Sequence, residues 1–229
     1  GTILSAGLCL GAPDPREENS DKRNVLIILS DDQGYVELNA FSDLYTKETL
    51  GYKEAPNWRN RKNDHLDKCI QAANRCMPNI DNLAERGIRF TELHTAPVCG
   101  PSRAMLMTAR YPQRFGLYSN LDMNEHGVPA GEHFLAEEFQ NAGYMTGIVG
   151  KWHLGHGEGQ HPNDRGFDFW VGFDSAQTAK YDSNMLYRNR ETAPAEGWLA
   201  DQFSSEAVHF LERADEADEP FFLYLAYNE

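Results

Sequence analysis

Two stretches of the chain, 24–30 and 220–227, are apolar at nearly every position and rich in β-branched or aromatic residues. Runs of this kind are typical of strands that are covered on both faces of a parallel sheet. Further strands are expected at 144–152 and at 88–95, where shorter apolar runs follow predicted helices.

Apolar residues at helical spacing predict three helices between these strands. The clearest helix is 201–214, whose apolar face consists of Phe203, Ala207, Phe210, Leu211 and Ala214. A shorter helix is expected between Pro78 and Gly87. Another contains Leu135, Phe139 and Ala142 and ends at Gly143.

Strands that alternate with helices indicate an α/β fold, with a largely parallel or mixed central sheet covered by helices on both faces. The 229 residues are enough for one large domain of this class. Residues 24–229 are expected to form its N-terminal part. Two residues follow the last predicted strand, so we expect a C-terminal portion to be missing.

The composition narrows the possible partners and the compartment. A net charge of −14 argues against nucleic acid, which binds clustered Lys and Arg. No apolar run is long enough to span a membrane. Residues 1–23 resemble the remnant of a signal peptide followed by a flexible charged leader, so we expect a periplasmic or secreted protein.

The long polar segment between the first two predicted elements leaves two questions open. Cys69 and Cys76 could pair in an oxidising compartment, and two free thiols are an equal alternative. Residues 52–76 contain six basic and three acidic side chains. Such a patch could attract a polyanionic substrate, although an ordinary solvated loop has the same composition.

Two adjacent carboxylates, Asp31 and Asp32, follow the first buried strand at the sheet edge where α/β proteins bind ligands. Neighbouring residues of a strand point to opposite faces, so both can meet one ion where the chain leaves the strand, as Gly34 would allow. A divalent cation would offset their desolvation. A solvated loop with helix-capping aspartates is the alternative.

Cys99 precedes a short apolar segment and is followed by Gly100, Pro101 and, four residues on, Arg103. With Gly100 as the N-cap and Pro101 as the first helical residue, Cys99 would lie at a helix N-terminus that attracts anions. The alternative is a buried cysteine before a core helix whose inward residues are Met105, Leu106 and Ala109.

Lys151 and His153 lie at the end of the strand predicted at 144–152, after its apolar residues Ile148 and Val149, and are two positions apart. Residues at this spacing in a strand point the same way, and a cation beside an imidazole suits an oxyanion ester. A solvated Lys-x-His pair is the common alternative. The remaining histidines have no comparable context, and His209 lies off the apolar face of its helix.

Two motifs together resemble the signatures of the type I sulfatases, which belong to the alkaline phosphatase superfamily. The first is Cys99-Gly100-Pro101-Ser102-Arg103, and the second is the segment from Gly143 through Gly150-Lys151-Trp152-His153. The resemblance covers residues 24–229 but matches about the first half of a sulfatase. It departs from the family at Ala109, which stands where the family has Gly; we expect a mild packing change there.

The resemblance implies that a maturating enzyme converts Cys99 to formylglycine. It also implies that Asp31, Asp32 and residue 99 bind one Ca²⁺. One hydroxyl of the hydrated aldehyde would attack the sulfur of a sulfated carbohydrate or aryl sulfate, and the other would later expel sulfate. Arg103, Lys151 and His153 would stabilise the charge and hydrogen-bond the reacting groups.

Three alternatives remain open at this point. A formylglycine hydrolase of phosphonate monoesters or phosphodiesters has a very similar nucleophile motif. A non-catalytic relative would bind sulfated polymer and keep Cys99 as a thiol. A thiol hydrolase using Cys99 explains neither Asp31-Asp32 nor the Lys151 segment. Whatever the reaction, we expect these 229 residues alone to be inactive and weakly folded, and turnover of an aryl sulfate by them would contradict this.

Overall fold

The computed structural model describes residues 22–34, 38, 40–41, 77–176, 178, 186–195 and 197–228. The expectations for the leader, the Cys69–Cys76 pair and the basic segment 52–76 lie mainly or wholly outside these residues. In the described part of the chain, no helix is long and apolar enough to cross a membrane.

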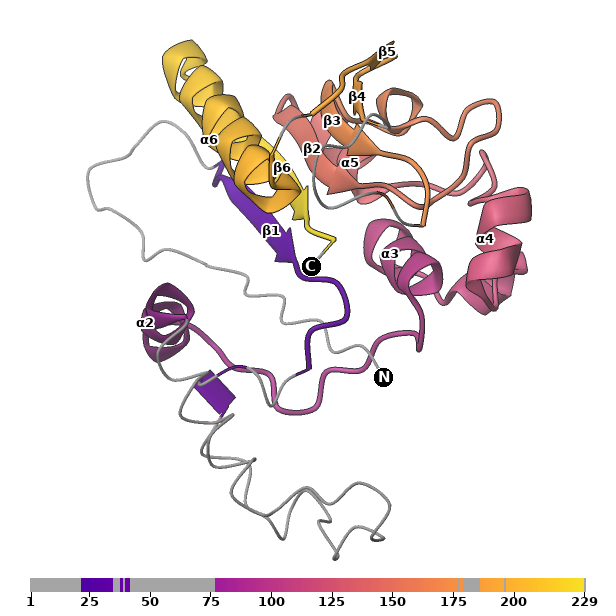
Figure 1. The fold of residues 1–229 in the computed structure, drawn as a ribbon, viewed down its shortest axis with the longest axis horizontal. Helices are drawn as coiled ribbons and strands as arrows, with labels where there is room; N and C mark the ends of the chain where they lie inside the picture. The colour runs from indigo at the N-terminus through magenta and orange to yellow at the C-terminus, as the bar shows by residue number, and fades with distance from the viewer. Residues whose placement is uncertain are drawn as a thin grey trace, which may run out of the picture.

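A six-stranded sheet forms the centre of the fold, with its strands in the order β1-β6-β2-β3-β4-β5 (Figure 1). Its strands are β1 (Val25–Leu29), β2 (Met145–Lys151), β3 (Phe169–Phe173), β4 (Tyr187–Arg188), β5 (Glu191–Thr192) and β6 (Phe221–Ala226). The first four in spatial order are parallel, and β3, β4 and β5 pair antiparallel. The sheet is therefore mixed, with a parallel core, as predicted.

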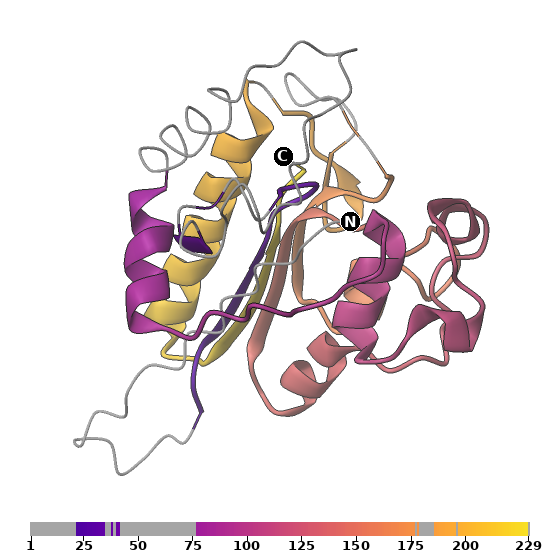
Figure 2. The same cartoon turned by 90° about the horizontal axis from the view of Figure 1, so that it is seen from below.

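Helices cover both faces of this sheet (Figure 2). The helical elements are α2 (Pro78–Arg86), α3 (Cys99–Thr108), η4 (Pro112–Phe115), α4 (Asn120–His126), α5 (Leu135–Asn141), η5 (Pro162–Asp164) and α6 (Leu199–Ala217). The long helix α6 lies on one side of the sheet, and α3 and α5 lie on the other. The prediction of helices on both faces is confirmed.

The alternation of side chains along β6 separates two hydrophobic cores. Phe222, Tyr224 and Ala226 belong to the core beneath α3 and α5, whereas Leu223 and Leu225 belong to the core beneath α6. Gly147 in β2 allows α6 to approach closely, because a Cβ there would lie 2.6 Å from the Phe210 ring. The continuous apolar run of β6 thus reflects burial on both faces.

Most predicted elements are present, with small shifts of their ends. The predicted strands at 24–30, 144–152 and 220–227 correspond to β1, β2 and β6, and the three predicted helices correspond to α2, α5 and α6. His209 is exposed on α6, as expected.

The strand predicted at 88–95 is wrong. This segment has no regular structure, and Ile88 and Phe90 are 73% and 55% exposed. None of the described strands pairs with it, and strand propensity without a pairing partner does not make a strand.

Candidate functional site

The candidate site lies at the sheet edge formed by the carboxyl ends of the parallel strands. Asp31 and Asp32 follow β1, and Lys151 and His153 lie at and just beyond the end of β2. Because β6 lies between β1 and β2 and pairs parallel with both, these ends lie at the same edge of the sheet, one strand apart. The candidate residues Cys99 and Arg103 come from the first turns of α3, which packs on this side of the sheet.

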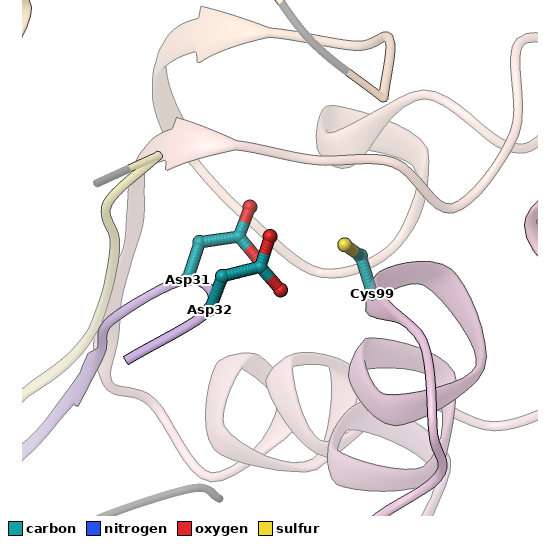
Figure 3. Close-up of side chains that lie close together, drawn as sticks. All are labelled: Asp31, Asp32 and Cys99. Atoms are coloured by element: carbon teal, nitrogen blue, oxygen red, sulfur yellow. The ribbon is translucent and has the colours of Figure 1, made fainter. Parts of the chain in front are cut away.

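The chain turns away from the direction of β1 at Asp32, whose φ is 55°. This left-handed conformation is rare for residues other than Gly, and Asp is among those that tolerate it best. The departure from the strand that two converging carboxylates require is therefore made by Asp32 itself rather than by Gly34. Both carboxyl groups are directed toward Cys99 (Figure 3).

Cys99 is the first residue of α3, so the predicted cap is wrong by two positions. Val98 is the N-cap in extended conformation, and its carbonyl accepts the Ser102 N–H at 3.1 Å. The Gly100 N–H, which lacks a partner within the helix, donates to Asn120 Oδ1 at 3.0 Å. Cys99 still lies at a helix N-terminus, where the backbone favours negative charge.

The residues that α3 buries are not the ones expected if it were simply a core helix after a buried cysteine, namely Met105, Leu106 and Ala109. Ala104 and Met107 are completely buried, whereas Ala109 is exposed and has a φ of 52° at the helix C-cap. Ala109 stands where the family has Gly, and the expected packing change is not what this substitution brings. Its effect is on the backbone, because glycine adopts this φ without the steric cost that a Cβ brings.

Asp31, Asp32 and Cys99 each offer one ligand atom, and the three atoms lie within 4.8 Å of one another. Carboxylate oxygens are the ligands that Ca²⁺ prefers. Two cations approach Asp31 at the same oxygen, Oδ2. The two carboxylates fit a hard divalent cation that is bound by oxygen atoms, and Sγ of Cys99 lies within reach of the same position.

Asp31 is nearly buried and is flanked by two buried cations. Lys151 Nζ lies 2.5 Å and Arg103 Nη2 3.8 Å from its Oδ2, and both cationic side chains are 1% exposed. Burial alone would raise the pKa of Asp31. The charges of Arg103 and Lys151, with a hydrogen bond from Cys99, outweigh burial and lower that pKa below its ordinary value.

The guanidinium of Arg103 connects α3 to the ends of β2 and β6. Nη1 donates to the backbone oxygen of Lys151 at 2.8 Å and to the hydroxyl of Tyr224 at 3.2 Å. Nη2 donates to the backbone oxygen of Tyr227 at 3.4 Å, and Nε is buried without a hydrogen-bond partner. Arg103 is therefore fixed in position while one N–H remains available to an oxyanion.

His153 lies two residues beyond the end of β2 and has a φ of 54°. Strand alternation therefore does not set its direction, contrary to the assumption behind the predicted pairing with Lys151. The side chain is 1% exposed. Burial, followed by the nearby charges of Lys151 and Arg103, lowers the pKa of His153 to about 3, so the ring is neutral at pH 7.

Sequence reasoning did not find three polar residues that support this site. Asn120 and Asn124 lie on α4, which was not predicted, and Tyr224 was treated as part of an apolar strand. The capping box between Ser119 and Asp122 is a local signal that could have located α4. The partner of the Tyr224 hydroxyl has no local signal, because Arg103 lies 121 residues away.

The model of the protein family described as Sulfatase matches residues 23–229, which include every residue of the candidate site. The chain belongs to the sulfatase family. It is 39% identical over 231 residues to the uncharacterised sulfatase YdeN of Escherichia coli K12, a match covering 90% of this chain and 40% of YdeN. It is 32% identical over 255 residues to the dog N-acetylgalactosamine-6-sulfatase, covering 98% and 41%.

Solved structures place this sulfatase chain in the same fold. The structure of Ps i-CgsB superimposes with a TM-score of 0.71 and 31% identity, covering 91% of this chain and 45% of that one. The chain spans about 40% of the length of the curated relatives it matches, YdeN and the dog N-acetylgalactosamine-6-sulfatase. It corresponds to part of a sulfatase, as the two sequence motifs indicated.

Proposed function

We propose that the protein containing this chain hydrolyses sulfate esters at the candidate site, with residue 99 as the nucleophile. The convergence of Asp31, Asp32 and Cys99 beside two buried cations carries this proposal. Burial makes it expensive to bring so many charged groups together, so their assembly calls for a ligand that interacts with them. A sulfate ester is such a ligand when a metal ion is also bound.

Asp31, Asp32 and residue 99 would hold a Ca²⁺ ion, together with ligands from the rest of the protein. When bound, the ion would polarise the sulfate oxygens and offset the charge of the two carboxylates. The two carboxylates balance Arg103 and Lys151, and His153 is neutral, so the ion would leave the site positive. This charge suits an anionic ester.

Arg103 and Lys151 would stabilise the negative charge that increases on the ester during the reaction. Both are held by hydrogen bonds before substrate arrives, Arg103 by backbone oxygens and Lys151 by Asp31. Fixed, buried donors stabilise developing charge more strongly than mobile exposed ones. His153, being neutral, can accept a proton at one ring nitrogen and donate one at the other.

Conversion of Cys99 to formylglycine by a maturating enzyme is part of this proposal. The hydrated aldehyde would supply a nucleophilic hydroxyl and a second hydroxyl that allows sulfate to leave. Sγ lies at the helix N-terminus and beside two carboxylates, and Cys99 is half-buried.

A sulfated carbohydrate is the substrate class we favour, in a periplasmic or secreted protein. One relative is named for N-acetylgalactosamine-6-sulfate chemistry, and a 30% identical neighbour was solved in complex with k-i-k-neocarrahexaose. Both names concern carbohydrates. Cell fractionation with an antibody against residues 200–217 would test export, and recovery in the cytoplasmic fraction would contradict it.

The experiment uses the full-length protein isolated after coexpression with a maturating enzyme. Peptide mass spectrometry should show formylglycine at position 99, and an aryl sulfate should be hydrolysed in a Ca²⁺-dependent manner. We expect Cys99→Ala to abolish turnover and Asp32→Asn to lower kcat by about 100-fold. Asp201→Asn is the matched control, because it makes the same change at an exposed position on α6.

Two results would overturn the proposal. One is full activity of the wild-type protein with an unconverted thiol at position 99. The other is faster hydrolysis of a matched aryl phosphonate than of the aryl sulfate, which would assign the site to phosphonate or phosphodiester chemistry instead.

A further inference from the structure

One face of α4 is directed at the candidate site. Asn120, Met123 and Asn124 are spaced i, i+3 and i+4, which places them on the same side of the helix. The Ser119–Asp122 capping box fixes the start of α4: Asp122 N–H donates to Ser119 Oγ at 3.2 Å, and Ser119 N–H donates to Asp122 Oδ2 at 2.8 Å. The helix is therefore a defined support despite its seven residues.

The first two of these side chains contact the N-terminus of α3. Asn120 Oδ1 accepts the Gly100 N–H at 3.0 Å, beside the nucleophile position. Met123 is completely buried, and a Cβ at Gly100 would lie 2.8 Å from Met123 Cγ. The two helices consequently pack with little room between them, and α4 cannot move independently of Cys99.

The third side chain, that of Asn124, contacts His153. Asn124 Oδ1 lies 3.2 Å from His153 Nε2, while His153 Nδ1 is buried and has no hydrogen-bond partner among the described residues. A neutral imidazole has one N–H and one lone pair. If Nδ1 carried the proton, a buried N–H would lack an acceptor, which is costly, whereas a proton on Nε2 is satisfied by the amide oxygen.

We propose that Asn124 is a positioning residue that holds His153 in the tautomer with its proton on Nε2, so that the Nδ1 lone pair is available to the reacting groups. The catalytic consequence of this inference rests on the proposed function, whereas the tautomer of His153 can be measured independently of it. The amide suits the task because it accepts the hydrogen bond without a charge, which keeps the ring neutral. Thus α4 sets both the nucleophile position, through Asn120 and Met123, and the base, through Asn124.

The direct test is ¹⁵N NMR of histidine-labelled full-length protein, with His153 assigned by its loss in His153→Gln. In the wild type at pH 7 we expect Nδ1 to resonate as an unprotonated nitrogen and Nε2 as a protonated one. In Asn124→Ala we expect averaged signals from both tautomers. A wild-type spectrum with the proton on Nδ1 would overturn the inference, whatever the activity of the protein.

Kinetics of conservative variants supply the second readout. We expect Asn124→Ala to lower kcat for an aryl sulfate by about tenfold with KM changed by less than about twofold, since substrate contacts are kept. Asn124→Asp keeps the acceptor and should retain the Nε2–H tautomer, recovering part of kcat. Glu125→Gln on the exposed side of the same helix is the control and should match the wild type.

These outcomes separate the inference from the proposed function. An Asn124→Asp spectrum with Nε2 unprotonated, or an unchanged kcat in Asn124→Ala, would overturn the positioning role. Failure of the wild type to hydrolyse any sulfate ester, with the expected tautomer present, would overturn the proposed function alone. If Asn124→Ala does not fold, the wild-type spectrum and the Asp variant still decide the question.

Discussion

Replacing Asp31 with Asn removes the negative charge that lies beside two buried cations. Lys151 Nζ is 2.5 Å and Arg103 Nη2 is 3.8 Å from Asp31 Oδ2, and each cationic side chain is 1% exposed. In Asp31→Asn both cations stay buried and lose this counter-ion. Because both cations remain shielded from water and lose the carboxylate that they contact directly, the folded state should be strongly destabilised.

Removing one partner of a buried ion pair costs about 3–5 kcal/mol of unfolding free energy. Two cations are affected here, so we expect Asp31→Asn to lie at the upper end, about 4–5 kcal/mol. Lys151→Met leaves Arg103 beside Asp31 and should cost about 3 kcal/mol. The double variant should cost less than the sum, with a coupling free energy of about 2–3 kcal/mol.

Urea unfolding of the full-length protein at pH 7, in the presence of a chelator, measures these values without a contribution from ion binding. Asp174→Asn is the control, because its partner His156 is 41% exposed and such surface pairs contribute less than about 1 kcal/mol. The pKa of Asp31 is lowered in the folded state, so its contribution is complete above its ordinary pKa. The contribution should disappear as the pH falls through the lowered value.

An additive double variant would refute this account. It would show that Asp31 and Lys151 stabilise the fold independently, and that their short separation contributes little free energy. A stability difference between wild type and Asp31→Asn that persists unchanged at strongly acidic pH would refute it as well, since a protonated Asp31 has no charge to lose.

Three further predictions concern separate features. Ala109→Gly should raise the urea unfolding free energy by about 1 kcal/mol, because it relieves a φ of 52° at the end of α3; an unchanged midpoint would show that the cap is not strained. The pKa of His153 falls from 6.5 to about 3 on folding, so the unfolded state binds the proton first as the pH drops. Stability should therefore decrease by up to about 1.4 kcal/mol per pH unit through this window, and urea midpoints of His153→Gln should lack that part of the slope. Tyr224→Phe removes a hydroxyl that accepts from Arg103 and should lower the unfolding free energy by about 1–2 kcal/mol, with Tyr187→Phe as the control.

Local pattern was sufficient for the elements that build the sheet edge. The apolar runs of β1, β2 and β6 and the amphipathic face of α6 are properties of adjacent residues, so they can be recognised without the fold. Parallel strands end at a common edge, and polar residues directly after them were therefore expected to meet there. The structure does bring Asp31, Lys151 and Cys99 together at that edge.

Local pattern failed where the outcome depends on a distant partner. The apolar segment 88–95 has the composition of a strand but gains no pairing partner among the described strands, whereas the short strand β3 was missed although it pairs with β2. Propensity measures what a residue prefers, and pairing supplies most of the free energy of a strand.

The chemistry of the candidate site was also predictable only in part. Cys99, Arg103 and the two aspartates could be identified as site residues from the residues next to them in the sequence. The tertiary structure decided the pairing of Lys151 with Asp31, the neutrality of His153 and the acceptor role of Asn124. Those properties arise from burial and from charges brought within a few ångströms by residues far apart in the chain, and neither quantity exists before the chain folds.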